Sequence, residues 1–95
     1  MRVEVTPEFV RSVDKLPFTA REAIDKRLVR ASGGNLGDHK SLGGALFEMR
    51  IFKGPGYRIY FTRRQAGEIV LCLLSGSKAS QRRDIAKARL IVREL

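Results

Sequence analysis

The stretch FEMRIFKGPGYRIYF, residues 47–61, predicts two alternating strands joined by a Gly-Pro-Gly turn. On the first strand apolar residues alternate with Glu48 and Arg50, and on the second they alternate with Arg58 and Tyr60. Successive side chains of a strand point to opposite faces, so the apolar set predicts a core face and these four residues share the other face. Alternation alone leaves that second face open to two interpretations, a solvated surface or a site that handles phosphate.

Size and composition predict one cytoplasmic domain over residues 1–95. A chain of 95 residues can bury a single core without metal or disulfide staples. The one cysteine, Cys72, cannot form an intrachain disulfide, and its place in IVLCLLS predicts a buried apolar residue in a protein of a reducing compartment. The longest apolar run, Ile69 to Leu74, is six residues, against about 20 for a bilayer span, so we expect no membrane partner. Glu4 and Glu8 interrupt any signal-peptide core.

The charge balance favours a polyanionic partner. Nineteen Lys and Arg residues against ten Asp and Glu residues give a net charge of +9, and thirteen of the nineteen are Arg. Such an excess suits nucleic acid, an anionic membrane surface or an acidic protein. Arginine enrichment favours phosphate, because the guanidinium fork binds phosphate oxygens in a bidentate way.

Periodicity along the chain predicts an α+β fold with a small, mostly antiparallel sheet in the order β-α-α-β-β-β-α. A strand at residues 2–5 precedes a helix capped by Thr6, and Thr19-Ala-Arg-Glu22 matches a capping box for a second helix. Residues 33–44, GGNLGDHKSLGG, are expected to form a polar loop. After the two strands of the opening stretch, EIVLCLLS predicts a central strand covered on both faces, and residues 79–95 predict a basic helix.

The chain lacks the residues that most kinds of catalytic site require. One His and one Cys give no zinc spacing, so no metal or other cofactor is expected, and His39 has no serine partner in a nucleophile context. The glycine-rich loop matches neither phosphate-loop pattern, which leaves Lys40 as a solvated lysine or a phosphate contact.

RNA cleavage by its own 2′-hydroxyl remains compatible with the residues. That reaction needs cationic stabilisation of the phosphorane and some proton transfer. Arg50 and Arg58, on one face, are candidates for the first role, and Glu48 for the second. Glu48 and Asp84 are the acids nearest to the basic clusters, and each could instead neutralise a neighbouring arginine.

The segments GNLGDHKSLGGALFEMRIFKGPGYRIYF and LLSGSKASQRRDIAKA resemble the RelE/ParE superfamily of bacterial toxins, and within it the HigB-like addiction module killer proteins. The shared pattern runs GNxGDxK, E-L/M-R, GPGYR-I/V-Y and GGDK-xxQ-xDI-xxA, and it spans residues 33 to 88. The resemblance implies a RelE-like sheet flanked by helices and a toxin of a type II toxin–antitoxin system. It also implies metal-independent cleavage of mRNA on the ribosome and a cognate antitoxin encoded by a neighbouring gene.

The same resemblance implies roles for particular residues. Arg50 and Arg58 fall where basic residues act on the scissile phosphate in ribosome-dependent relatives. Glu48 and Asp84 become candidates for proton transfer, with Gln81 an alternative. Tyr60 would stack on a base if its ring is exposed and would otherwise pack on the sheet. The expected contacts to the RNA backbone are Lys40, Lys78, Gln81, Arg82 and Arg83.

Two departures from the pattern affect the expected activity. Ser77 replaces an acid that is common in the GGDK motif, and Ile85 lies about where RelE has a catalytic tyrosine. The identity of the general base therefore stays open. Two alternatives also stay open: a ParE-like inhibitor of DNA gyrase, and an RNA-binding homologue with weakened catalysis.

Overall fold

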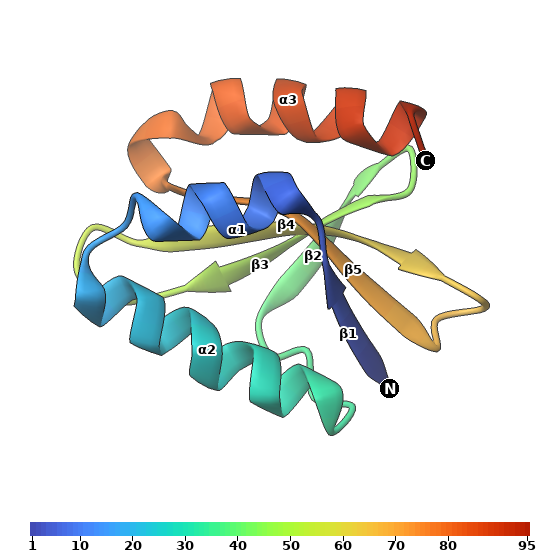
Figure 1. Ribbon diagram of the computed structural model, residues 1–95, viewed down its shortest axis with the longest axis horizontal. Coiled ribbons are helices and arrows are strands. Elements are labelled where there is room, and N and C mark those ends of the chain that lie inside the picture. Colours follow the sequence, from blue (N-terminus) through green and yellow to red (C-terminus); the bar gives the residue numbers. More distant parts are fainter.

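The computed structural model describes residues 1–95 as a five-stranded sheet with helices packed on it (Figure 1). The elements in chain order are β1 (Arg2–Val5), α1 (Pro7–Asp14), α2 (Phe18–Ser32), β2 (His39–Gly43), β3 (Leu46–Ile51), β4 (Tyr57–Arg64), β5 (Ile69–Ser77), a 3-10 turn (Lys78–Ser80) and α3 (Gln81–Arg93). The strand order is β1-β5-β4-β3-β2, and only the β1–β5 pair is parallel. The α+β class with a mostly antiparallel sheet is confirmed. None of the helices has both the length and the apolar composition needed to cross a bilayer.

The prediction of a loop over residues 33–44 is wrong for its second half. His39–Gly43 forms the edge strand β2, which pairs antiparallel with β3. The segment carries no alternating apolar pattern, because an edge strand with one weakly covered face does not need one. Tertiary contacts hold it instead: the guanidinium of Arg89 on α3 donates to the carbonyls of Leu42 and Gly43, at 2.9 and 3.1 Å.

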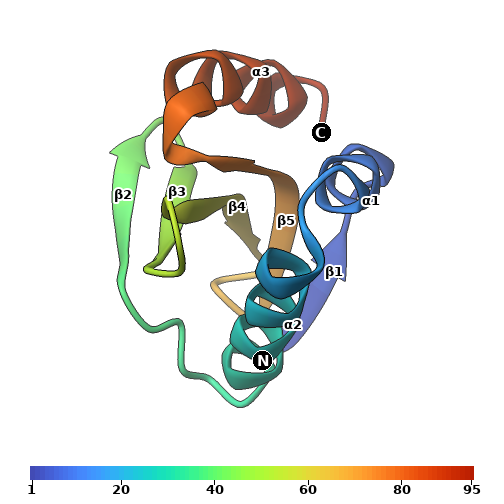
Figure 2. The same ribbon diagram turned by 90° about the vertical axis from the view of Figure 1, so that its left-hand side faces the viewer.

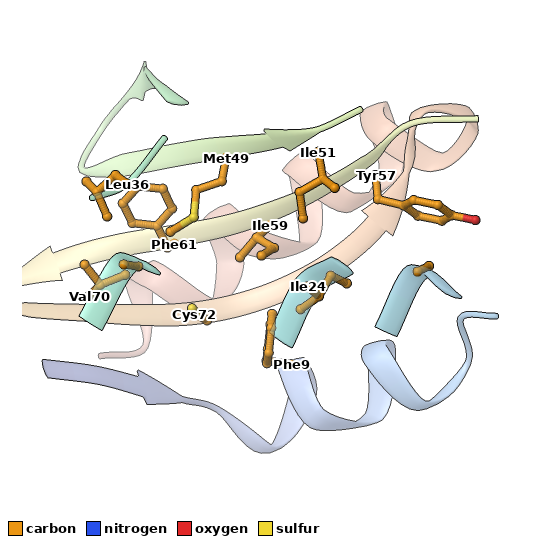
Figure 3. Packing of buried hydrophobic residues seen from close by; sticks show 12 residues of the cluster. Phe9, Ile24, Leu36, Met49, Ile51, Tyr57, Ile59, Phe61, Val70 and Cys72 are labelled. Carbon is orange, nitrogen blue, oxygen red and sulfur yellow. The ribbon is translucent and has the colours of Figure 1, made fainter. Parts of the chain in front are cut away.

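One face of the sheet packs against α1 and α2. Phe9 of α1 and Ile24 of α2 meet the odd-numbered apolar residues of β3 and β4, together with Val70 and Cys72 of β5 (Figure 3). This is the core face that alternation predicts, and Cys72 is fully buried in it as expected. Burial raises the pKa of the Cys72 thiol to about 12, which disfavours the reactive thiolate at neutral pH.

The other face packs against α3, which lies on its own side of the sheet in Figure 2. Leu71 and Leu73 of β5 point to this side, whereas Val70 and Cys72 point to the first. The prediction that β5 is covered on both faces is therefore confirmed, and the last helix supplies the second cover. The buried hydrophobic residues on this side are Leu46, Tyr60, Leu71, Leu73, Leu74 and Ala88.

The two helix starts behave differently. Thr6 caps α1 as predicted, since its hydroxyl accepts from the Phe9 N–H at 3.0 Å. The capping box predicted at Thr19 is wrong. The second helix already begins at Phe18, with Pro17 in the cap position and no side-chain cap bond, so Thr19 lies inside the first turn.

The turn between β3 and β4 fixes the register that places two arginines side by side. Arg50 and Arg58 are direct cross-strand partners, so their side chains lie on the same face, as alternation predicts. Gly56 closes the turn with φ +87°, a conformation that favours glycine, and its carbonyl accepts from the Lys78 N–H at 3.1 Å. The turn thereby ties Lys78 to the end of the hairpin.

Arg27, a buried arginine of α2, holds the chain that leads into β2 and β3. Its guanidinium donates to the carbonyls of Leu36, Asp38 and Arg50 at 3.2, 2.6 and 2.7 Å. Burial lowers the pKa of Arg27, with a further contribution from Arg30. Gly37 has φ +64°, and a Cβ there would come within 2.6 Å of the Arg27 Nε. Glycine at this position therefore lets the loop pass without displacing the Arg27 guanidinium.

Replacing Arg27 should lower the free energy of unfolding more than replacing an exposed residue on the same helix. Arg27→Met keeps an aliphatic side chain but leaves three buried or partly buried carbonyls without their donor. We expect the free energy of unfolding to fall by about 3 kcal/mol in urea denaturation. Lys26→Met, an exposed change on the same helix, should alter it by less than about 0.5 kcal/mol. Equal losses in the two variants would contradict a clamping role for Arg27.

Candidate active site

A small cationic pocket lies at the β3–β4 turn, where the hairpin meets the 3-10 turn before α3. Its volume is about 280 Å³, and Arg50, Arg58 and Lys78 line it together with the glycines of the turn. Three cations around one pocket suit an anion such as phosphate. The structure thus brings together three of the residues that the sequence analysis selected.

Arg58 is held in this pocket by a buried carboxylate. The Arg58 Nε lies 2.7 Å from Oε1 of Glu48, which is fully buried, and the Gln81 amide donates to the same oxygen at 3.1 Å. The Arg58 contact is an ion pair rather than a well-aligned hydrogen bond, because the Nε–H does not point at the carboxylate oxygen. The Arg58 side chain is 13% exposed, and its terminal nitrogens make no hydrogen bond within the protein. Arg58 can therefore bind an outside anion without leaving Glu48.

Glu48 is shielded by its neighbours from solvent. Its Oε2 has no hydrogen-bond partner, and Lys40, its cross-strand partner on β2, approaches it only to 3.9 Å. The Lys40 side chain is half exposed. The solvated-face interpretation is therefore wrong at Glu48, since strand alternation identifies which face a residue is on but not whether a helix covers it.

Arg50 is held more loosely than Arg58. Its Nη2 donates to Oδ1 of Asp38 at 3.0 Å, and both side chains are more than a third exposed. A pair of this kind contributes about 1 kcal/mol or less, so an incoming anion can replace Asp38 at small cost. Asp38 was missed as a site residue, although it lies inside the GNLGDHK motif that supports the family resemblance.

Tyr60 does not meet the condition for base stacking. It is fully buried under α3, opposite Glu48 in the β3–β4 register, and its hydroxyl has no hydrogen-bond partner. Burial raises the pKa of Tyr60, and the negative charges of Glu48 and Asp84 raise it further, so the phenol stays protonated at neutral pH. The alternative of a sheet-packing tyrosine therefore describes this conformation.

Asp84 packs on Gly76, the cross-strand partner of Arg58 on β5. It is buried in the first turn of α3 and accepts a short hydrogen bond from Ser80. Its carboxylate packs so closely on Gly76 that no side chain would fit there. Asp84 lines a different cavity from Arg50 and Arg58, and no ion pair joins it to either arginine.

That second cavity, the α1–α3 groove, is larger and also basic. Its volume is about 880 Å³, and it lies between α1 and the start of α3. Arg82 and Arg83 line it, with serine hydroxyls from β5 and the 3-10 turn. No acid of the chain forms an ion pair with the cations of this groove, which are Arg11, Lys15, Arg82, Arg83 and Lys87.

The structure contains no cluster of side chains suited to binding a metal ion. No three residues among the histidine, cysteine, aspartate and glutamate side chains gather closely enough to hold a metal ion. His39 bonds through Nδ1 with the Gly37 carbonyl at 2.9 Å in the loop before β2.

The buried ion pair should matter more to stability than an exposed pair of similar geometry. Glu48→Gln keeps the shape but leaves Arg58 without its counter-charge, and we expect a loss of about 3 kcal/mol in the free energy of unfolding. Glu4→Gln is the matched control, because Glu4 pairs with the Arg2 Nε at 3.0 Å on the surface. Its loss should stay below about 1 kcal/mol. Similar values in denaturant titrations would show that burial does not strengthen the Glu48 contact.

Solved structures with a similar fold identify the fold of this chain. The chain has the fold of RelE, as three solved structures show. They are the isolated Escherichia coli RelE toxin (18% identity, 94% of this chain and 97% of that one, TM-score 0.67), the Methanococcus jannaschii RelB–RelE antitoxin–toxin complex (16%, 83% and 94%, 0.68) and the intact E. coli RelBE toxin–antitoxin complex (19%, 80% and 94%, 0.66).

Sequence comparison defines the family more narrowly. The chain is 38% identical over 96 residues to an uncharacterized protein of Haemophilus influenzae, and the match covers 100% of this chain and 96% of that one. The chain belongs to the same family as that protein. No family model matches the chain.

Proposed function

We propose that this protein is the toxin of a type II toxin–antitoxin system, a HigB-like ribosome-dependent endoribonuclease of the cytoplasm. The observation that carries the proposal is the pocket at the β3–β4 turn. There a buried carboxylate orients Arg58, and Arg50 and Lys78 complete a cationic site for one phosphate. The likeness to RelE supports it through the fold, and the sequence motifs support it through these same residues.

The pocket suits cleavage in which the substrate supplies its own nucleophile. The 2′-hydroxyl of the ribose gives up its proton as its oxygen attacks the adjacent phosphorus. The bond from phosphorus to the 5′-oxygen breaks and that oxygen takes up a proton, so that a cyclic 2′,3′-phosphate and a 5′-hydroxyl result. Negative charge builds up on the phosphoryl oxygens, where the terminal nitrogens of Arg58 and the ammonium of Lys78 stabilise it. Arg50 joins them by exchanging Asp38 for the phosphate.

The proposed roles of the carboxylates follow from their exposure. Glu48 is fully buried behind Arg58, so it orients the guanidinium, with the Gln81 amide on the same oxygen. A role for Glu48 in proton transfer would require α3 to shift and uncover Oε2. Asp38 is the partly exposed carboxylate bonded to Arg50, and once displaced it becomes a proton acceptor beside the phosphate. Asp84 lines the α1–α3 groove, where its candidate role would act on RNA that enters that groove.

Mapping of mRNA ends tests the nuclease proposal. Induction of the protein should produce new 5′ ends that follow the codon phase, because ribosome-bound mRNA is presented in that phase. Arg58→Ala and Arg50→Ala should each lower the frequency of these ends by roughly a hundredfold, the usual effect of removing one donor to a developing oxyanion. Arg64→Ala, an exposed change on β4, should leave the ends unchanged.

Folding controls belong to this experiment, because Arg58→Ala strands the buried Glu48. Arg50→Ala avoids that difficulty, since its partner Asp38 is exposed. Intact mRNA accompanied by double-strand DNA breaks would contradict the nuclease and favour the ParE-like alternative. Ends that form equally in both arginine variants would exclude the pocket as the active site.

We also propose a cognate antitoxin, encoded by an adjacent gene, with an acidic segment that docks on the α1–α3 groove. The RelB–RelE structures are antitoxin–toxin complexes, and in this chain the unpaired cations of the groove supply charge complementary to an acidic segment. Arg82 and Arg83 then contact an acidic chain when the toxin is inhibited and RNA phosphates when it is free. The ribosome and its mRNA are the partners of the free form.

Charge reversal tests the docking of the antitoxin. Expression from the native operon should yield a complex that high salt alone does not fully dissolve. Arg82→Glu combined with Arg83→Glu should weaken the complex at least about tenfold, through loss of two close charge pairs. Arg63→Glu combined with Arg64→Glu changes the net charge equally at the β4–β5 end and should have little effect. A toxin that always purifies free, or equal weakening by both pairs of changes, would contradict the proposal.

A further inference from the structure

Phe52 is a side chain that packing does not explain. It follows the last residue of β3 and is 82% exposed, more than any other large apolar side chain of the protein. Exposing a phenyl ring forgoes roughly 2 kcal/mol of burial. Phe52 is one of the residues that line the pocket of Arg50, Arg58 and Lys78.

Phe18, the other strongly exposed phenylalanine, has a partner for its ring. It is 64% exposed at the start of α2, where the Arg21 guanidinium lies over its ring, 5.8 Å from the centroid. Phe52 has no aromatic or cationic partner on its ring. Its distinction is therefore its position: it is an open aromatic face beside a cluster of phosphate-binding cations.

A nucleotide presents the two groups that this arrangement would recognise. Its phosphate suits the cations, and its base suits an unpartnered aromatic ring, because every base has a π-face. Tyr57 also lines the pocket but is buried in the core under α1 and α2, and Tyr60 is buried opposite Glu48, so neither ring offers an open face. Phe52 comes just before Gly54, Pro55 and Gly56 of the hairpin turn, which line the pocket as well.

We propose that Phe52 is the stacking platform for a base of single-stranded RNA whose phosphate occupies the Arg50–Arg58–Lys78 pocket. This inference rests on the proposed function and adds a positioning residue to it. Stacking holds the nucleotide next to the reacting phosphate and favours no particular base strongly, since it reads a face and not a hydrogen-bonding edge.

The absence of tryptophan from the chain gives a direct test. Phe52→Trp introduces a single indole at the proposed platform, and a stacked base quenches indole fluorescence. The probe is a short 2′-O-methyl oligoribonucleotide, which has no free 2′-hydroxyl and cannot be cleaved. We expect quenching with this probe and none with ribose 5-phosphate, which offers a phosphate without a base. Phe18→Trp is the matched control and should not respond to either.

Affinity measurements separate stacking from general attraction of charge. Phe52→Ala and Phe52→Leu should weaken binding of the oligonucleotide roughly tenfold and leave binding of ribose 5-phosphate unchanged. Arg50→Ala should weaken both. Wild-type affinity in Phe52→Leu, equal quenching in the two tryptophan variants, or no quenching at all would overturn the proposal.

The two proposals fail in distinguishable ways. Codon-phased cleavage that depends on Arg58 but not on Phe52, without quenching in Phe52→Trp, removes the platform and leaves the nuclease. Quenching in Phe52→Trp together with intact mRNA after induction removes the nuclease and leaves a nucleotide-binding pocket with its platform.

Discussion

Arg27 reaches from α2 to three backbone carbonyls, and the candidate site depends on where those carbonyls are held. One of them belongs to Asp38 and another to Arg50, so a single guanidinium positions both members of the ion pair at the edge of the site. No carboxylate pairs with Arg27, although it is buried, and the lowered pKa reflects that environment. Carbonyl dipoles satisfy its donors well enough to keep it charged, since arginine retains its proton even when its pKa falls.

Two arginines side by side repel each other, and the structure offsets this with one carboxylate for each. Glu48 is covered by α3 and stays with Arg58, whereas Asp38 is open to solvent and can yield Arg50 to another anion. Because their carboxylate partners differ in burial, the two arginines differ in how firmly they are held. Arg58 is preorganised by a permanent partner, and Arg50 is available at small cost. An incoming phosphate would find one guanidinium already aimed at it and a second that must change partner.

Local sequence patterns predicted those features that depend on neighbouring residues. The period of two in the β3–β4 hairpin identified the shared face of Arg50 and Arg58, and the apolar run of β5 indicated a strand covered on both sides. Strand β2 was missed because an edge strand among glycines carries no apolar alternation, and its pairing with β3 and its bonds from Arg89 are long-range contacts. The capping box at Thr19 was wrong because a motif of two residues is weak against a helix that starts one residue earlier.

Three features follow from the amino-acid sequence without any long-range contact: the strongly basic character of the protein, the β3–β4 hairpin, and the side of the sheet on which Arg50 and Arg58 lie. These follow from composition and from the alternation of side chains along a strand, both of which are properties of the chain alone. Only the tertiary structure decided which of these side chains meet solvent. Packing of α3 buries Glu48 and Tyr60, leaves Phe52 open beside the pocket, and directs Arg82 and Arg83 into the α1–α3 groove, away from Arg58. Exposure depends on which element covers a face, and that depends on contacts between residues far apart in the chain.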